Sequence, residues 1–363
     1  MLRAGAMNNR SEEQKIRVLV VDDSVLMSRQ ISNILTNAGG IEVVGRAKDG
    51  SEALSMVSDL NPDVVTLDVE MPNMNGITAL KHIMIKHATP AVMISALTTD
   101  GARTTFDAFK YGAFDVVAKP SRREDVDLAV QKAEIVAKVK RAAGISRDRL
   151  RYIRIANSFT TVRRTGFGSP DATTRFFVLG AGTGGHYTLL RIVPSLPERF
   201  PGVVVSVIQM AARYVELFAS FLGAHSQIPI VSAVTGRTVE RGVCYISSSQ
   251  DRLTLGTDPA GRLTFQKVGL QGNSVTGEES AVDAMFKSAA GVAGTRAVGV
   301  VLSGVGRDGG EGLMEIKKNG GLTVVQEINN CTDPAMPLAA LEKGTVGRIL
   351  PDFAMADFFA KLA

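Results

Sequence analysis

The feature that most constrains the fold is a regular alternation of short β-branched runs with helical stretches. From Ile16 the runs IRVLVV, IEVVGRA, DVVTL, AVMIS and FDVVA are separated by stretches of helical periodicity, and the fifth ends near Pro120. Strands joined by helices at this spacing form parallel βαβ units, whose sheets are buried on both faces. The alternation starts again at Phe176 with FFVLG, VVVSVIQ, AVGVVLSG and LTVVQ. The sequence therefore predicts two α/β domains in succession.

The domain boundaries follow from helical periodicity and from charge. A predicted helix over residues 124–143 closes the first domain, which we expect to span 14–143. Residues 138–164 carry nine basic side chains against one acid, and GFGSPD at 166–171 favours turns. We interpret 144–174 as a basic linker and 175–363 as the second domain. The 363 residues suffice for this arrangement, because domains average roughly 100–200 residues.

Composition and cysteine spacing exclude several classes of protein. No stretch approaches the roughly 18 consecutive apolar residues of a membrane span, and the first residues lack the apolar segment of a secretory signal. We therefore expect a cytoplasmic protein without integral membrane association. Cys244 and Cys331 are far apart and lack zinc-ligand spacing, so neither a disulfide framework nor a zinc site is expected. A net charge of +5 permits acidic partners but does not diagnose a nucleic-acid binder.

Polar side chains follow four of the predicted strands of the first domain. Asp22 and Asp23 follow the first strand, and Asp68, Ser95 and Lys119 follow three later ones. The carboxyl ends of parallel strands meet at one edge of the sheet, where ligands bind. Three carboxylates favour Mg²⁺ or Mn²⁺, and a hydroxyl beside an ammonium suits a phosphoryl group. The pattern predicts that Asp68 attacks phosphorus and forms an acyl phosphate.

These motifs closely resemble the receiver domain of two-component response regulators, over residues 16–143. VLVVDDS, VTLDVEMPNMNG, ISAL and AKPS stand where that family has its acidic pair, phosphoacceptor, switch hydroxyl and switch lysine. The resemblance implies a flavodoxin-like fold and phosphorylation of Asp68 by a CheA-like histidine kinase. It also implies Mg²⁺ held by Asp22, Asp23, Asp68 and the carbonyl of Glu70.

The resemblance further assigns the phosphoryl-binding switch to Ser95 and Lys119. One position differs from the family pattern, because Val116 stands where an aromatic residue is common. We therefore expect the Ser95 movement but not an aromatic rotamer switch.

Most of residues 175–347 resemble the catalytic domain of the chemotaxis protein-glutamate methylesterase family, CheB, in which a receiver and a linker also come first. The matching stretches are GAGTGGHYTLLRIVPSLPERFP, VVVSVIQM, VDAMFKSA, VGVVLSGVGRDGGEGL, TVVQE and AMPLAAL. The resemblance implies a doubly wound, Rossmann-like α/β fold that binds chemoreceptor cytoplasmic tails. The chemistry of the family is ester hydrolysis by a serine, a histidine and an aspartate, with backbone amides that stabilise the oxyanion. No cofactor is implied for this domain.

Two of the three catalytic positions differ from the family. Gly182 stands where the family segment G-A-S-T-G-G has its serine. Met210 stands where the family segment Gln-His-Met has its histidine. Asp308 matches the aspartate, while Val305 replaces a methionine whose amide is associated with the oxyanion. Losing nucleophile and base together removes the covalent route. We therefore expect a degenerate site without methylesterase activity, in a domain that acts by binding or as a phosphate sink.

An active methylesterase or glutamine deamidase remains as the alternative, with relocated residues such as Thr183 and His186. The Thr183 hydroxyl lies beside the nucleophile position, but its simpler role is to cap the helix expected from Gly184. His186 falls in the first helical turn, where a partly exposed structural role is the commoner one. Asp308 has no histidine to orient, and we expect it to bind Arg307 or loop amides.

Two further classes have weaker support. Gly180, Gly182 and Gly185 form a G-x-G-x-x-G after a strand, but the second strand lacks the ribose-binding acid, and Glu198 lies in a loop. The same helix start could hold a carboxylate or another anion. The basic residues of 138–164 fit no helix-turn-helix pattern, so we expect no nucleic-acid partner.

Overall fold

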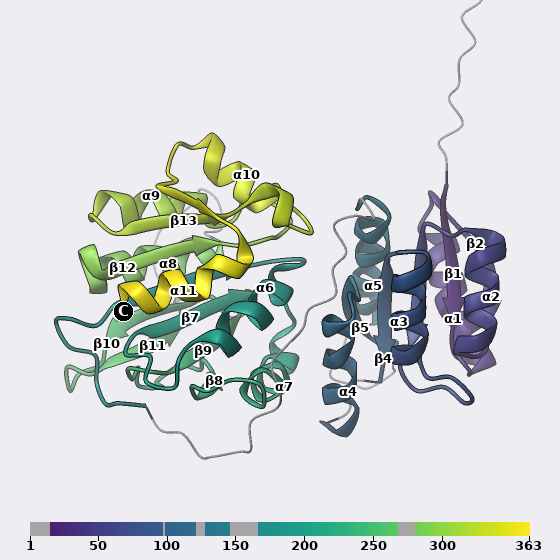
Figure 1. Cartoon of the computed structure of the whole chain (residues 1–363), viewed down its shortest axis with the longest axis horizontal. Helices are drawn as coiled ribbons and strands as arrows, with labels where there is room; N and C mark the ends of the chain where they lie inside the picture. Colours follow the sequence, from purple (N-terminus) through teal and green to yellow (C-terminus); the bar gives the residue numbers. More distant parts are fainter. Residues whose placement is uncertain (1–14, 97–98, 121–127, 146–165, 268–279) are drawn as a thin grey trace, which may run out of the picture. The chain divides into compact units, whose positions relative to one another are not determined.

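The computed structural model describes residues 15–96, 99–120, 128–145, 166–267 and 280–363 (Figure 1). The chain forms two compact units, one of Met1–Ser95 with Val117–Gly144 and the other of Ala96–Val116 with Ile145–Ala363. Both are α/β structures, which confirms the predicted fold class. Most of the expected linker, residues 146–165, lies outside the described residues. Within the described part of the chain, no helix is long and apolar enough to cross a bilayer.

A five-stranded sheet in the order β2-β1-β3-β4-β5 forms the centre of the first unit, although Asp115 and Val116 at the start of β5 are grouped with the second. Its strands start and end within one residue of the predicted runs. They are β1 (Ile16–Val21), β2 (Ile41–Ala47), β3 (Val64–Asp68), β4 (Ala91–Ser95) and β5 (Asp115–Ala118). Its helices are α1 (Val25–Asn37), α2 (Gly50–Leu60), α3 (Gly76–Lys86) and α5 (Leu128–Ala143). Right-handed crossovers place α1 with α5 on one face and α2 with α3 on the other, and each pair is in contact.

Polar residues start helices α1, α2 and α3 of the first unit, directly after the strands or the loops that follow them. The side chain of Ser24 accepts a hydrogen bond from the Met27 amide at the start of α1. Asp49 caps α2 in the same way, and Asn75 caps α3. Each cap satisfies an amide that has no partner inside its helix. The chain therefore turns sharply from strand to helix along the edge that carries the acidic residues.

The second unit contains a seven-stranded sheet in the order β14-β13-β12-β6-β7-β9-β8, in which neighbouring strands run parallel, and a separate antiparallel pair. The strands of the large sheet are β6 (Phe176–Ala181), β7 (Val203–Ile208), β8 (Ile230–Ser232), β9 (Cys244–Ser248), β12 (Ala297–Val301), β13 (Leu322–Gln326) and β14 (Arg348–Leu350). The pair is β10 (Leu253–Thr257) and β11 (Leu263–Lys267).

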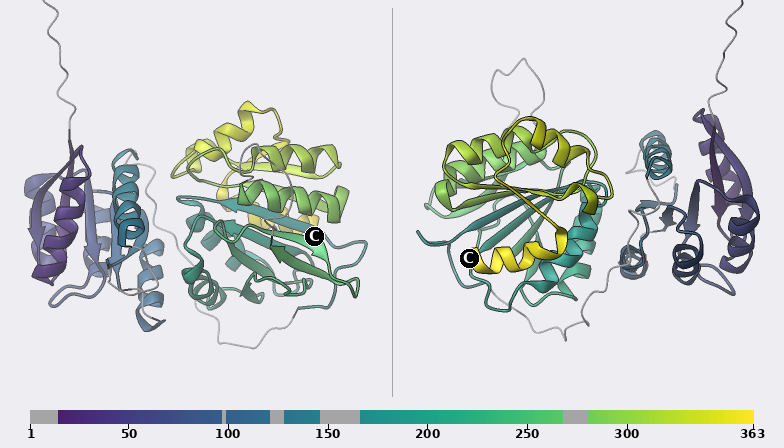
Figure 2. Two further views of the ribbon diagram at one scale, coloured as in Figure 1. Left: turned by 180° about the vertical axis from the view of Figure 1, so that it is seen from behind. Right: turned by 45° about the horizontal axis from the view of Figure 1, so that its top comes forward.

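Helices cover both faces of the large sheet, as its parallel strands require. The helices are α6 (Gly185–Ile192), α7 (Ala212–Gly223), α8 (Ala281–Ala293), α9 (Gly310–Lys318), α10 (Ala335–Glu342) and α11 (Asp352–Leu362). Helix α6 contacts α11, whereas α8 contacts α9, and α9 contacts α10 (Figure 2). Helix α6 connects β6 to β7, and α9 connects β12 to β13. These two connections step toward opposite edges of the sheet. Right-handed connections therefore put the two helices on opposite faces.

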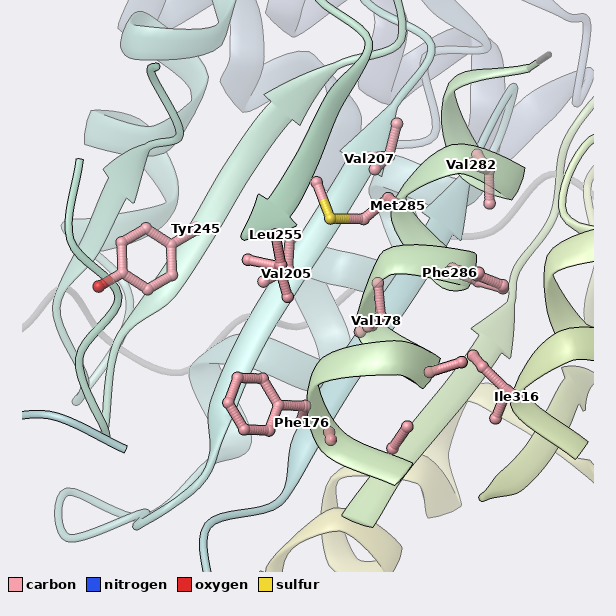
Figure 3. Close-up of a cluster of buried hydrophobic side chains, with 14 of the residues drawn as sticks. Phe176, Val178, Val205, Val207, Tyr245, Leu255, Val282, Met285, Phe286 and Ile316 are labelled. Carbon is pink, nitrogen blue, oxygen red and sulfur yellow. The ribbon is translucent and has the colours of Figure 1, made fainter. Parts of the chain in front are cut away.

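The main core of the second unit lies between the sheet and the helices α8 and α9. Phe176 and Val205 project from β6 and β7 toward Met285 and Phe286 of α8, and Ile316 of α9 closes one side (Figure 3). All five side chains are almost fully buried. Small residues on α8 let the helix approach the sheet closely, and these are Ala281, Ala284, Ala289, Ala290 and Ala293.

Helix α4 (Thr99–Lys110) belongs to the second compact unit, where it packs on α6 and α7. The ring of Phe106 meets Phe218 edge-on at 5.5 Å between centroids, and the ring of Phe109 lies 4.0 Å from that of His186. Both phenylalanines are buried. His186 is consequently enclosed among aromatic rings.

The last residues of the expected linker are bound to the second unit. Backbone hydrogen bonds of 2.9 Å join Phe167 and Gly168 to Arg241. The guanidinium of Arg241 also pairs with Asp171 at 2.8 Å and donates to the carbonyl of Phe167 at 3.2 Å. Residues 166–174 therefore form part of the folded structure.

We predict that Arg241→Ala loosens this anchor. Losing the ion pair and the hydrogen bond costs about 1 kcal/mol, which corresponds to an about fivefold faster cleavage at Phe167 when cleavage follows local opening. Limited proteolysis with chymotrypsin measures the rate. Arg262→Ala is the matched control, because Arg262 pairs only locally with Asp258. Equal cleavage of the two variants would contradict the proposed anchor.

Candidate functional sites at the strand ends

The carboxyl edge of the first sheet brings together the predicted acidic residues. Asp22, Asp23 and Asp68 each offer a carboxylate oxygen, and these three oxygens lie within 4.8 Å of one another. Asp22 and Asp68 are buried, whereas Asp23 is exposed. An all-carboxylate donor set of this size matches the ligand preference of Mg²⁺. The residues therefore fit the ion implied by the sequence.

Lys119 is the cation that faces this cluster. Its ammonium lies 2.7 Å from Asp68 Oδ2 and 3.0 Å from Asp22 Oδ2. Its backbone amide donates to the carbonyl of Ser95 at 2.8 Å, so the two predicted switch residues are joined directly. Ser95 and Val116 are both buried.

Burial and charge shift the pKa values of Asp68 and Lys119 in opposite directions. Burial raises the pKa of Asp68 to about 6, although the hydrogen bond from Lys119 works against the rise. For Lys119, burial disfavours the charged form, but its hydrogen bonds to Asp68 and Asp22 outweigh this and raise its pKa. A positive charge is thus held at the carboxylate that would carry a phosphoryl group.

The glycine of the MPNMNG motif is required by a close backbone approach. The Gly76 amide donates to the carbonyl of Val69 at 3.0 Å, and a Cβ atom on Gly76 would overlap the carbonyl oxygen of Asp68. The side chain of Glu70 is exposed on the same loop. The loop after β3 therefore folds tightly against the start of α3 and sets the position of Asp68.

The carboxyl edge of the second sheet brings together the three positions at which the family resemblance places serine, histidine and aspartate. Gly182 follows β6, Met210 follows the neighbouring strand β7, and Asp308 lies in the loop after β12 on the other side of β6. The Gly182 amide donates to the carbonyl of Ser303 at 2.9 Å. The loops after β6 and β12 are thus joined beyond the strands.

The nucleophile position is closed by neighbouring atoms. A Cβ atom on Gly182 would lie 2.6 Å from Gln209 Oε1 and 2.6 Å from the Cα of Gly304. The approach is reciprocal, because a Cβ atom on Gly304 would lie 2.8 Å from the Cα of Gly182. Real Cβ atoms do not come this close to backbone, so a side chain at position 182 requires the backbone of Gly182 or of Gly304 to shift.

The Gly304 loop is held in place by hydrogen bonds on both sides. Its amide donates to the carbonyl of Asp333, and its carbonyl accepts from the Met336 amide, both at 2.9 Å. The buried amide of Ser303 donates to Gln326 Oε1 at 2.9 Å. Moving the loop away from Gly182 would break or strain several of these bonds, each of which contributes about 1 kcal/mol.

Met210 is held by its backbone. Its amide donates to the carbonyl of Ile208 at 2.9 Å, and its carbonyl accepts from the hydroxyl of Ser248 at 2.6 Å. The residue is half-buried. Its thioether cannot accept a proton from a nucleophile at neutral pH, so the position supplies no general base.

Asp308 does not bind Arg307, contrary to one of the two partners predicted for it. Arg307 pairs with Glu342 at 2.7 Å. The side chain of Asp308 instead contacts the hydroxyl of Ser280 and faces the amides of Val282 and Asp283 at 3.3 and 3.2 Å. These amides open α8, so the aspartate sits at a helix terminus, where unsatisfied amides attract carboxyl oxygens.

The structure also corrects the predicted role of Thr183. Helix α6 begins at Gly185 with Gly184 as its N-cap, and no side chain caps it. Gly184 has a φ of 79°, a left-handed conformation that glycine adopts readily and that displaces Thr183 from the capping position. His186, expected to be partly exposed, is 7% exposed between Phe109 and Tyr187.

Three residues of the second site were not found from the sequence. Gln209 and Gly304 matter because they occupy the space beside Gly182, and no sequence pattern reveals such a contact. Ser280 had a signal, because S-x-x-D before an apolar run is a capping box. It stands at the N-cap of α8, where its hydroxyl binds Asp283 and Asp308.

Comparison with known proteins agrees with both resemblances. The family described as CheB methylesterase matches residues 177–359, and the response regulator receiver domain matches residues 18–131. A protein-glutamate methylesterase/protein-glutamine glutaminase of Pyrococcus abyssi is 40% identical over 342 residues, covering 93% of this chain and 91% of that protein. The chain belongs to the CheB methylesterase family.

Other members of the CheB family match over a similar length. Protein-glutamate methylesterase/protein-glutamine glutaminase 1 of Caulobacter vibrioides is 40% identical over 357 residues, which is 96% of this chain and 98% of that protein. Among solved structures, the response regulator domain of Thermotoga maritima CheB is 42% identical and covers 36% of this chain and 98% of that domain, with a TM-score of 0.33. The catalytic domain from the same organism is 27% identical and covers 52% of this chain and 99% of that domain, with a TM-score of 0.48.

We predict that Gly182→Ala destabilises the second unit by about 1–3 kcal/mol, because the added methyl group must push apart the backbones of Gly182 and Gly304. Chemical denaturation followed by circular dichroism measures the change. Gly291→Ala is the matched control, since Gly291 is an exposed residue within α8 and a Cβ atom there meets nothing within 4 Å. The control should gain about 0.5–1 kcal/mol. A Gly182→Ala variant as stable as the parent would refute the closed position.

Proposed function

We propose that this CheB-type response regulator is phosphorylated on Asp68 and acts through a methylesterase-like domain that no longer hydrolyses esters. The proposed partners are a CheA-like histidine kinase and the cytoplasmic tails of chemoreceptors, which places the protein in the cytoplasm. The effector domain would work by binding, either as a competitor of an active relative or as part of a phosphate sink. The main observation in favour of lost catalysis is that Gln209 and Gly304 leave no space for a side chain at position 182.

The receiver half of the proposal rests on the arrangement around Asp68. Asp22, Asp23, Asp68 and the carbonyl of Glu70 would hold Mg²⁺, which supplies positive charge next to a transferring phosphoryl group. Lys119 already lies 2.7 Å from Asp68 and would neutralise a phosphoryl oxygen. Ser95 would move toward the phosphoryl group, and its carbonyl is bonded to the Lys119 amide.

Three features support the loss of ester hydrolysis. Position 182 has no hydroxyl and no room for one without backbone movement. Position 210 carries a thioether in place of an imidazole. Asp308 is engaged with α8. The members of such triads act as a unit, so losing two of them removes most of the rate enhancement.

The alternative of a relocated active site has less support. His186 is packed against Phe109 at 4.0 Å between ring centroids, and the hydrogen-bond partners of Asp308 do not include it. Thr183 is buried, and its carbonyl is bonded to the hydroxyl of Ser303. Neither residue is therefore arranged with Asp308 as a nucleophile and base would be.

We predict that acetyl phosphate with Mg²⁺ adds one phosphoryl group to the protein and that Asp68→Asn abolishes the addition, because an amide oxygen is a poor nucleophile. Phosphate-affinity electrophoresis and mass spectrometry measure the product. Asp59→Asn is the control, because Asp59 is an exposed acid on α2. Equal labelling of Asp68→Asn and the parent would rule out Asp68 as the acceptor.

We further predict that the phosphorylated protein releases neither methanol from methylated receptor membranes nor ammonia from receptors with unmodified glutamines. A relative with serine and histidine at the two positions serves as the positive control. Methanol release that Thr183→Ala abolishes would establish the relocated site and overturn the loss of catalysis. Binding of receptor tails is measured separately, by sedimentation with the membranes, and is expected to persist.

A further inference from the structure

The surviving aspartate belongs to a hydrogen-bonded chain that includes a second acid. The hydroxyl of Ser280 contacts Asp308 Oδ1 and also lies 2.7 Å from Asp283 Oδ2. A serine hydroxyl has one hydrogen, and ionised carboxylates only accept. Two ionised carboxylates would leave one of these contacts without a proton. One of the two carboxyl groups must therefore supply it.

The neighbouring groups indicate which acid carries the proton. Asp283 Oδ1 accepts a hydrogen bond of 2.6 Å from the Gly312 amide at the start of α9, a shorter contact than either amide makes with Asp308. Asp308 faces two amides of α8 at longer distances, 3.3 and 3.2 Å. Among the described residues, no ion pair joins Asp308 to a lysine or arginine, because Arg307 pairs with Glu342, and Lys343 pairs with Glu311.

We propose that Asp308 is a carboxylic acid that donates to Ser280, which in turn donates to the carboxylate of Asp283. Through the Gly312 amide, this chain links the loop after β12, the start of α8 and the start of α9. The inference goes beyond the proposed function, because it gives the former catalytic aspartate a structural role controlled by a proton.

The electrostatic surroundings of Asp308 agree with the protonated form. Burial raises the pKa of Asp308, and the charge of Asp283 raises it further, whereas the contacts with Ser280 and the two α8 amides oppose the rise. Because the pKa of Asp308 is raised in the folded state, its protonated carboxyl group stabilises the fold at low pH. This stabilisation is lost as the pH rises through the folded-state pKa. At higher pH two carboxylates would then face one hydroxyl, and the junction of α8 and α9 would loosen.

Hydrogen exchange of the full-length protein tests the proposal across a series of buffers from mildly acidic to mildly alkaline. The amides of Val282, Asp283 and Gly312 report on the junction after correction for the intrinsic exchange rate. Their protection should fall with rising pH, by up to about tenfold for each unit by which the folded-state pKa of Asp308 exceeds the unfolded value. If protection in the parent protein stayed constant or rose with pH, that result alone would overturn the proposal.

Asp308→Asn distinguishes a carboxylic acid from a carboxylate. The asparagine amide group can donate to Ser280 while its oxygen accepts from α8, as a protonated acid does. The variant should therefore keep the low-pH protection of the parent and lose the pH dependence. Asp283→Asn is the contrasting control, because it removes the ionised acceptor and should reduce protection at every pH. If Asp308→Asn reduced protection at every pH, or failed to fold while Asp283→Asn folded, Asp308 would act as an ionised cap and the proposal would fail.

Discussion

Parallel sheets covered by helices on both faces leave one place for polar chemistry, the edge at which the strands end. Both units are built on this constraint. In the first unit the edge carries three carboxylates and Lys119, which lie at the ends of three different strands or directly after them. In the second unit the corresponding edge carries Gly182, Met210 and Asp308. The buried sheets hold the strand ends rigidly, so the properties of each edge depend on a few side chains and on how closely the loops approach.

The sequence predicted much of this arrangement, for a physical reason. Buried parallel strands read as short β-branched runs, so β1 to β5 could be placed within a residue and their following residues assigned to one edge. Burial and charge then act on the side chains found there, which is why Asp68 and Lys119 are paired as expected. The antiparallel pair β10 and β11 was not predicted, because it is short and does not repeat the alternation of strand and helix.

The departures in the second unit arise from contacts between residues distant in the sequence. Thr183 was predicted to cap α6, but a left-handed glycine takes the N-cap position. Asp308 binds Ser280, 28 residues earlier in the chain, and not Arg307 beside it. The approach of Gly182 to Gly304 depends on two loops and on the bonds that hold Gly304 to Asp333 and Met336. A motif comparison shows which residue types differ from the family pattern, but it does not show how the surrounding atoms fill the space.

The close approach at Gly182 also bears on how such a site can change over evolutionary time. Replacing a serine by glycine removes atoms and is tolerated locally, after which neighbouring backbone can settle into the space. Restoring a side chain then meets a bonded loop, and the first step back carries a stability cost that the first step away did not. Because natural proteins are only marginally stable, selection would oppose that step before any activity was regained. A side chain lost at this position would thus be hard to regain, because stability would have to be given up before activity could return.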